Sequence, residues 1–348
     1  MSKIDIKAMI KDLKKNELTE LISVAQEVLS TLFNSSEIRD NVKESRFSKG
    51  YECPKCQCKD VNKNGKSNGR QRYICKRCRT SFDEFTMSPF SNTKLGLDKW
   101  IKYCELMILG LSIRKCAEEV GVGVKTSFYM RHRILDVINL SLKNDKVEGI
   151  VEVDECFIKE SFKGNHSKST TFVMPRNPRK RGKGKNDKKK RGISKEQICI
   201  ETAIDRKGNI LMSAVCNGRI TTNQIINFFD NKICEDATFC VDSHKSYMAI
   251  KDKLNIELKQ VPRGKSMIDS VYHLQHINAL HSSFKRWLMT FNGVSTKYIN
   301  NYLAWFKFLQ LSKKNKKGDR IKDMLVNVAT KDTYVTRATI RNRFIELI

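Results

Sequence analysis

The chain has 348 residues, enough for about two or three domains with at least one sizeable hydrophobic core. It carries 66 Lys and Arg against 38 Asp and Glu, a formal net charge of +28. Such a surplus attracts polyanions, so nucleic acid is the leading candidate partner, with a ribosome or an anionic membrane surface as alternatives. No apolar run is long enough to cross a membrane and the N-terminus lacks a signal peptide. We therefore expect a soluble, cytoplasmic and nucleoid-associated protein with no membrane partner.

The N-terminal region, residues 1–45, has apolar residues at helical spacing among charged ones. This pattern predicts one or two amphipathic helices. Their apolar stripe needs a surface to pack against. Either the rest of the chain or a second copy of it could provide that surface.

Residues 50–84 change in composition to Cys, Gly, Asn, Lys and Arg. Two Cys-x2-Cys pairs, separated by residues 57–74, have the spacing that presents four thiolates to one Zn²⁺. The predicted ligands are Cys53, Cys56, Cys75 and Cys78. Cys58 is a spare thiol that could compete with Cys56. A segment this short and polar needs a metal ion to fold. We therefore expect a zinc ribbon, which contacts DNA or, alternatively, another protein.

Residues 94–146 are helical in pattern, with a break at 121–123 that contains two glycines. Ile113, Ala117 and Val120 share one face before the break, and a second helix follows it. This arrangement is typical of a helix-turn-helix, with a plain helical hairpin as the alternative. The second helix carries side chains suited to phosphate and base-edge contacts, namely Lys125, Thr126, Ser127, Tyr129, Arg131, His132 and Arg133.

Residues 148–312 alternate between strand and helix patterns, which predicts a mixed α/β domain. The expected strands are 150–158, 197–205, 209–216, 237–241 and 256–261, and the expected helices are 222–233, 245–254 and 267–291. A basic loop, 163–195, interrupts this domain, and ten basic side chains face one acid within 176–192. We expect this loop to contact DNA, through Arg179, Lys180 and Arg181 among others. Residues 313–348 are expected to form a basic C-terminal tail.

Three motifs of the α/β domain carry candidate chemistry. Asp154 lies among apolar residues in VEVDECFI. Burying a carboxylate costs free energy unless it is paired or binds a metal ion, so Asp154 is a candidate functional residue. Asp242 falls where a hydrophobic strand gives way to a helix, a usual place for active-site groups. Asn278 and Lys285 are seven residues apart in a predicted helix, so they share one face, with His281 between them.

The succession VEVDE, VDSHKSY, YHLQHINALHSSFKRW and GVSTKYINNYLAW resembles the DDE-type insertion-sequence transposases with an N-terminal zinc ribbon. The resemblance covers about residues 50–312. It implies a multidomain protein with a ribonuclease H-like α/β catalytic domain, in which Asp154 and Asp242 bind Mg²⁺ or Mn²⁺. Most relatives have a Glu as third ligand, seven residues before a Lys. Here that position is Asn278, whose carbonyl oxygen can still ligate a hard cation, with His281 as the alternative.

The resemblance also implies an activity. A transposase binds the double-stranded ends of its insertion sequence, as a homo-oligomer in the DNA complex, and catalyses two-metal strand cleavage and strand transfer. Lys285 would then hold a phosphate near the scissile bond, and Asn278 would complete the catalytic set. Two alternatives stay open: a DNA-binding regulator without chemistry, and a structure-specific nuclease of the same fold that cleaves without joining.

Overall fold

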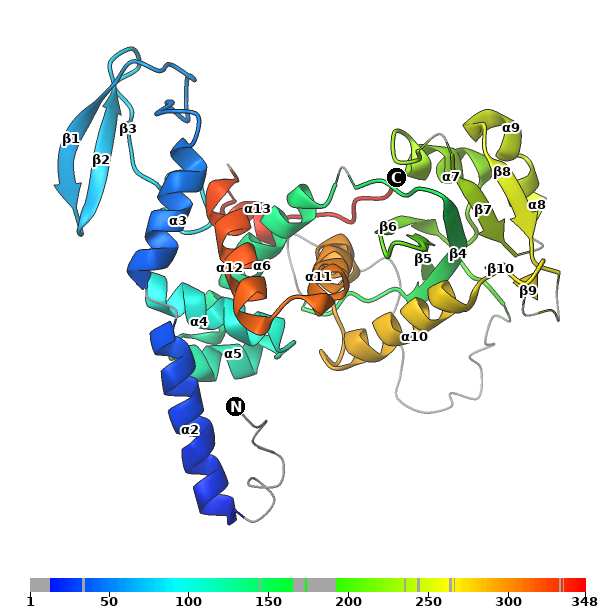
Figure 1. The fold of residues 1–348 in the computed structure, drawn as a ribbon, viewed down its shortest axis with the longest axis horizontal. Coiled ribbons are helices and arrows are strands. Elements are labelled where there is room, and N and C mark those ends of the chain that lie inside the picture. The colour runs from blue at the N-terminus through cyan, green and yellow to red at the C-terminus, as the bar shows by residue number, and fades with distance from the viewer. Residues whose placement is uncertain are drawn as a thin grey trace, which may run out of the picture. The chain divides into compact units, whose positions relative to one another are not determined.

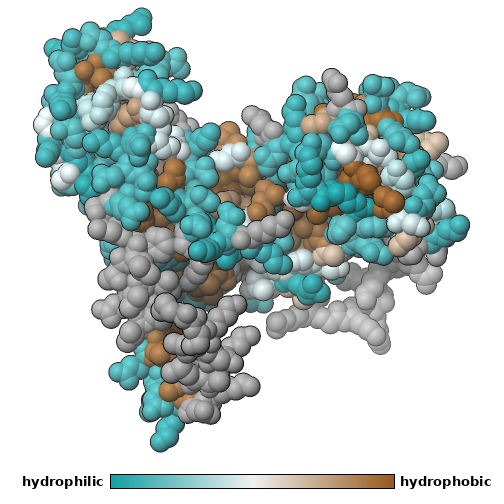
Figure 2. Space-filling view, viewed as in Figure 1, coloured by the Kyte–Doolittle hydropathy of each residue, from teal (hydrophilic) through white to brown (hydrophobic). Residues whose placement is uncertain are grey.

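A computed structural model describes residues 13–32, 35–143, 145–164, 173, 192–234, 236–242, 245–262, 265, 267–331, 333 and 335–348. The chain forms two compact units (Figure 1). Unit 1 contains residues up to 111, 115–123 and 317–334, and unit 2 contains 112–114, 124–316 and 335–348. Hydrophilic residues cover most of the face that Figure 2 shows. Among the described residues, no helix combines the length and the apolar character needed to span a bilayer.

Unit 1 is built from helices and a small sheet. Its helices are α2 (Lys15–Leu32), α3 (Ser35–Phe47), α4 (Leu97–Ile108), most of α5 (Ile113–Val120) and α12 (Lys317–Thr330). Helices α3 and α4 both contact α12. Of the one or two helices predicted for the N-terminal region, the structure has two, and the second extends to Phe47.

The C-terminal region is not the tail that the sequence suggested. Ile321, Met324, Leu325 and Val328 of α12 are buried. Their spacing of three and four residues gives the helix an apolar stripe, which packs against α3 and α4. Residues 317–330 thus belong to the core of unit 1.

The cysteine-rich segment folds as a three-stranded antiparallel sheet of β1 (Val61–Ser67), β2 (Arg70–Cys75) and β3 (Ser81–Phe82). The β1–β2 turn uses Asn68 and Gly69, both with positive φ, as in a tight hairpin turn. A small core of Cys53, Tyr73, Cys75 and Phe82 lies beneath it, with Phe47 of α3 packed alongside. Strand β1 leaves no apolar pattern in the sequence, because its residues are almost all polar.

Unit 2 contains a five-stranded mixed sheet in the order β6-β5-β4-β7-β8. Its strands are β4 (Ile150–Lys159), β5 (Gln197–Asp205), β6 (Ile210–Asn217), β7 (Thr238–Val241) and β8 (Glu257–Gln260). Strand β4 pairs antiparallel with β5 and parallel with β7. The mixed α/β class and all five strands are as predicted from the sequence.

Helices cover both faces of this sheet (Figure 1). Val151 and Val153 of β4 belong to a core completed by α7 (Thr222–Phe229) and by residues in and after α8 (Lys245–Met248). Cys156 and Ile158 point the other way, toward α10 (Gln275–Met289) and α11 (Ile299–Leu311). Side chains alternate along a strand, so Asp154 shares the α10 face with Cys156, and Glu155 shares the opposite face with Val153.

Three helical predictions in unit 2 need correction. The predicted helix 267–291 begins only at Gln275, because β9 (Met267–Ile268) and β10 (Tyr272–His273) form a hairpin whose turn has positive φ at Asp269 and Ser270. The predicted helix 245–254 divides into α8 and α9 (Lys251–Leu254). The predicted helix 222–233 ends at Phe229. The remaining elements are α6 (Val124–Ser141), α13 (Arg337–Arg341) and the short helices η1 (Thr296–Tyr298) and η2 (Ser312–Lys314).

Candidate active site and metal-binding residues

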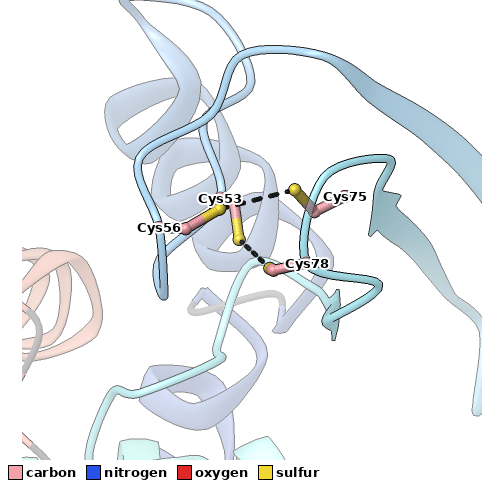
Figure 3. Close-up of side chains that lie close together, drawn as sticks. All are labelled: Cys53, Cys56, Cys75 and Cys78. Atoms are coloured by element: carbon pink, nitrogen blue, oxygen red, sulfur yellow. Dashed lines mark hydrogen bonds between the residues drawn. The ribbon is translucent and has the colours of Figure 1, made fainter.

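The four predicted zinc ligands come together in unit 1. Cys53 and Cys56 lie in the loop before β1, and Cys75 and Cys78 lie at the turn after β2 (Figure 3). The Sγ atoms of Cys53 and Cys78 are 3.5 Å apart, and those of Cys56 and Cys75 are 3.6 Å apart. All four lie within 4.8 Å of one another. Cys58 is not part of this group.

The cysteine cluster has the dimensions of a tetrahedral metal site. Four sulfurs at the usual 2.3 Å from Zn²⁺ are about 3.8 Å apart, close to the distances seen here. Hydrogen bonds with the side chain and backbone of Thr80 lower the pKa of the Cys78 thiol to about 6, which favours the thiolate that a metal needs. The residues therefore fit a zinc ion.

The parallel pairing of β4 and β7 brings the two predicted catalytic aspartates together. The register pairs Val151 with Phe239 and Glu152 with Cys240. Continued by two residues, it places Asp154 level with Asp242, which follows directly after β7. Adjacent strands are about 4.8 Å apart, so the two carboxylates lie at neighbouring positions of the sheet.

The electrostatic environment of Asp154 reflects this arrangement. Burial, followed by the nearby charges of Glu155 and Asp242, raises the pKa of its carboxyl to about 7, whereas Lys285 acts in the opposite direction. The side chain is 25% exposed, so the carboxyl is reachable from solvent. Asp154 therefore sits where negative charge accumulates, and a bound cation would relieve that charge.

Helix α10 supplies the remaining candidate groups on this face. Asn278 and Lys285 are exposed on it, whereas His281 is buried between them. His281 Nδ1 lies 3.7 Å from Asp154 Oδ2, too far for a hydrogen bond. Burial and the charge of Lys285 lower the pKa of His281 to about 4, so the ring is neutral at pH 7. The sequence thus placed all three residues on the correct helix.

The opposite face of the sheet holds an acidic group that the sequence analysis missed. Glu201 of β5 stands opposite Glu155 in the β4–β5 pairing, and both carboxylates interact with Tyr247. Burial, followed by the charge of Glu155, raises the pKa of Glu201 well above its usual value. The sequence did contain an indication of this acidic group, because Glu155 belongs to the VEVDE motif and Tyr247 to the VDSHKSY motif.

A second group that was missed lies on the α10 face, two residues before Asp154. Glu152 is almost fully buried, and its carboxylate lies against His273 and His276. The ligand atoms of these three residues lie within 4.8 Å of one another. The sequence did indicate this position, because side chains alternate between the two faces of a strand, so Glu152 and Asp154 of VEVDE must share a face.

The predicted DNA-contacting residues of α6 divide into two groups. Lys125 is exposed, and Thr126 and Arg133 are partly exposed, so they stay candidates. The prediction that Arg131 contacts DNA needs correction, because its side chain is 0% exposed and its guanidinium lies 4.9 Å from the centre of the Trp305 ring. Ser127 and His132 are buried as well. Arg179, Lys180 and Arg181 lie outside the described residues.

Part of the chain matches a known transposase family. Residues 146–310 match the family described as ISXO2-like transposase domain. This part of the chain is therefore similar to an insertion-sequence transposase domain. The transposase domain spans the mixed sheet, both aspartates and α10, so the resemblance to insertion-sequence transposases is confirmed.

Curated and solved relatives were also found. A protein of Halobacterium salinarum described as an uncharacterized protein in transposable element ISH50 is 25% identical over 264 residues, which is 75% of this chain and 86% of that protein. A pre-cleavage Mos1 transpososome matches at 12% identity and a TM-score of 0.22, over 64% of this chain and 75% of that one. The Mos1 paired end complex with Mn matches at 15% identity and the same TM-score, over 63% and 75%. A TM-score this low carries no argument about the transposase domain.

Proposed function

We propose that this protein is a DDE-type transposase that cleaves the ends of its insertion sequence and joins them to target DNA. One observation carries the proposal: the β4–β7 register, if continued two residues past Glu152 and Cys240, would align Asp154 with Asp242, and the charges of Asp242 and Lys285 both act on Asp154. The strand order around β4, with antiparallel partners on one side and parallel ones on the other, suits a ribonuclease H-like catalytic domain.

The carboxylates would hold Mg²⁺ or Mn²⁺. Such ions, when bound, activate the attacking water or 3′-hydroxyl and stabilise the leaving oxygen. Asp154 and Asp242 provide the hard oxygen ligands that these cations prefer. Lys285 lies close enough to oppose the negative charge at Asp154, so its ammonium group can hold a phosphate beside the two carboxylates.

Asn278 is our choice for the third oxygen. It lies on the same helix as Lys285, two turns earlier, and its exposed amide is free of the burial that surrounds His281. His281 Nδ1 lies 3.7 Å from Asp154 Oδ2, but imidazole is a poor ligand for hard cations. We therefore assign His281 to packing between α10 and the sheet.

DNA binding would come from other parts of the chain. We propose contacts from the zinc ribbon, from the helix-turn-helix through Lys125, Thr126 and Arg133, and from the basic loop that contains 179–181. The charge of +28 supplies non-specific attraction to double-stranded DNA. Because the element has two ends, we expect at least two copies of the chain to act together.

The test is a strand-transfer assay with the terminal sequences that flank the gene and a supercoiled target. Cleavage at the element ends followed by joining supports a transposase. Binding of the ends without cleavage would identify a regulator instead. Cleavage without any joined product would identify a nuclease.

A further inference from the structure

The first turn of α10 has an unusual anchor. Its N-cap residue is Leu274, whose side chain offers no hydrogen-bond acceptor to the exposed backbone N–H groups. The N–H of Ile277 instead donates to Glu152 Oε2 at 3.0 Å. The acceptor is therefore a carboxylate 125 residues away in sequence, on strand β4.

Glu152 is well placed to hold this turn firmly. Its side chain is 1% exposed, and a negative charge at a helix N-terminus is favourable because the helix dipole is positive there. A buried carboxylate needs compensation, and Arg206, in the turn after β5, provides it by donating to Glu152 Oε1. Arg206 also donates to the carbonyl of Val271 at 3.1 Å, in the β9–β10 hairpin that leads into α10.

The two histidines complete this group. His276 Nδ1 lies 2.7 Å from Glu152 Oε1 and also contacts Arg206. The carboxylate can only accept and the guanidinium can only donate, so Nδ1 makes one of these two hydrogen bonds at a time, as donor to Glu152 or as acceptor from Arg206. His273 Nδ1 accepts from the N–H of Gln275 at 3.3 Å, at the start of the helix. The guanidinium contacts Glu152 Oε1 and His276 Nδ1, and the N–H of Gln275 contacts His273 Nδ1, so these contacts favour an ionic clamp over a metal site.

The clamp lies beside the catalytic residues. Glu152 and Asp154 are on the same face of β4, and Ile277 directly precedes Asn278. Fixing Ile277 to Glu152 therefore sets the distance between Asn278 and Asp154. We propose that Glu152, held by Arg206, is a positioning residue that locks the first turn of α10 so that Asn278 can meet the metal ions bound by Asp154. This inference rests on the proposed function for its catalytic consequence, but the lock itself does not depend on it.

The test compares Glu152→Ala, Glu152→Gln and a control, Glu148→Ala, in the full-length protein. Glu148 is the matched control because it forms an ion pair of 2.7 Å with Lys207, beside Arg206, but is more exposed, and its hydrogen bonds and ion pairs among the described residues go to Lys207 and Asp205 and not to α10. Hydrogen exchange of the 274–280 segment measures the lock directly. Cleavage of element-end DNA and thermal unfolding are measured on the same samples.

We expect Glu152→Ala to speed exchange at Ile277 at least about tenfold and to lower the cleavage rate about 100-fold, since a displacement near 1 Å can have that effect. Glu152→Gln keeps an oxygen that accepts from Ile277, so it should restore part of the protection and part of the rate. Glu148→Ala should leave both unchanged. If Glu152→Ala unfolds, Glu152→Gln decides by the same two readouts.

Unchanged exchange at Ile277 in both Glu152 variants would overturn the inference, as would full cleavage activity in Glu152→Ala. A transition metal bound to the wild type and lost in His276→Ala, with the ribbon zinc retained, would also overturn it. A wild-type protein that never cleaves DNA but shows the expected exchange pattern would refute the proposed function and leave the lock standing.

Discussion

The hydroxyl of Tyr247 donates a hydrogen bond of 3.2 Å to Glu201 Oε1, and both side chains are completely buried. Glu155 also interacts with Tyr247, from the strand position opposite Glu201. A tyrosine between two carboxylates joins β4, β5 and α8 on the face away from α10. The same motif that contributes Asp242 contributes this tyrosine, so the buried bond ties the segment after β7 to the sheet.

The raised pKa of Glu201 has a consequence for stability. Because folding raises the pKa of this carboxyl, the folded protein holds its proton to higher pH than the unfolded chain, which releases it near the usual pKa of 4.5. The group therefore costs stability increasingly as pH rises above that value. Glu201→Gln removes the cost and keeps an oxygen for Tyr247. Its free energy of unfolding should exceed that of the wild type by at least about 1 kcal/mol at pH 8 and by less at pH 5. Equal differences at both pH values in urea titrations would contradict this.

The zinc site can be tested by metal analysis. Cys75→Ser removes one thiolate from the group of four, so zinc should fall from one ion per chain to near zero. Cys58→Ser is the matched control, because Cys58 lies in the loop that holds Cys53 and Cys56 but outside the cluster, and it should retain the ion. One zinc per chain in Cys75→Ser would refute the assignment.

The burial of Arg131 predicts a separation between stability and DNA affinity. Arg131→Ala should lower the free energy of unfolding by about 1–3 kcal/mol, because it removes a cation–π contact and leaves a cavity beside Trp305. Lys125→Ala should leave stability unchanged and weaken DNA binding. Chemical denaturation and end-binding titrations measure the two effects. A Lys125→Ala protein that binds DNA as tightly as the wild type would argue against α6 as a DNA-contacting helix.

The choice of third ligand separates Asn278 from His281. Asn278→Ala should abolish cleavage, and Asn278→Asp should keep part of it, because the carboxylate restores an oxygen ligand. His281→Ala removes a packing group near Asp154 and should reduce cleavage far less. The opposite order, an active Asn278→Ala with an inactive His281→Ala, would assign the role to His281.

Much of the transposase domain could be predicted because its longer strands are rich in apolar and β-branched residues. Strands β4 and β5 are buried on both faces, so their pattern is strong and their limits were found to within a residue. The positions of Asp154 and Asp242 followed from those strands, since one interrupts an apolar run and the other ends one.

The parts that the sequence did not reveal depend on contacts between distant residues. Arg131 appears exposed by composition, but Phe291 and Trp305 enclose it from elsewhere in the chain. The apolar stripe of α12 is hidden among many charged residues, so only its packing against α3 and α4 identifies it as core. Glu152 looks like an ordinary strand residue until α10 is placed beside it.

The most direct test of the central claim is the effect of removing each aspartate on DNA cleavage and joining in Mg²⁺ or Mn²⁺. Asp154→Ala and Asp242→Ala should each abolish cleavage and strand transfer and leave binding to the element ends largely intact, because the binding residues lie elsewhere. Asp252→Ala, an exposed aspartate on α9, is the control and should behave like the wild type. Normal cleavage by Asp154→Ala would contradict the metal-dependent transposase mechanism.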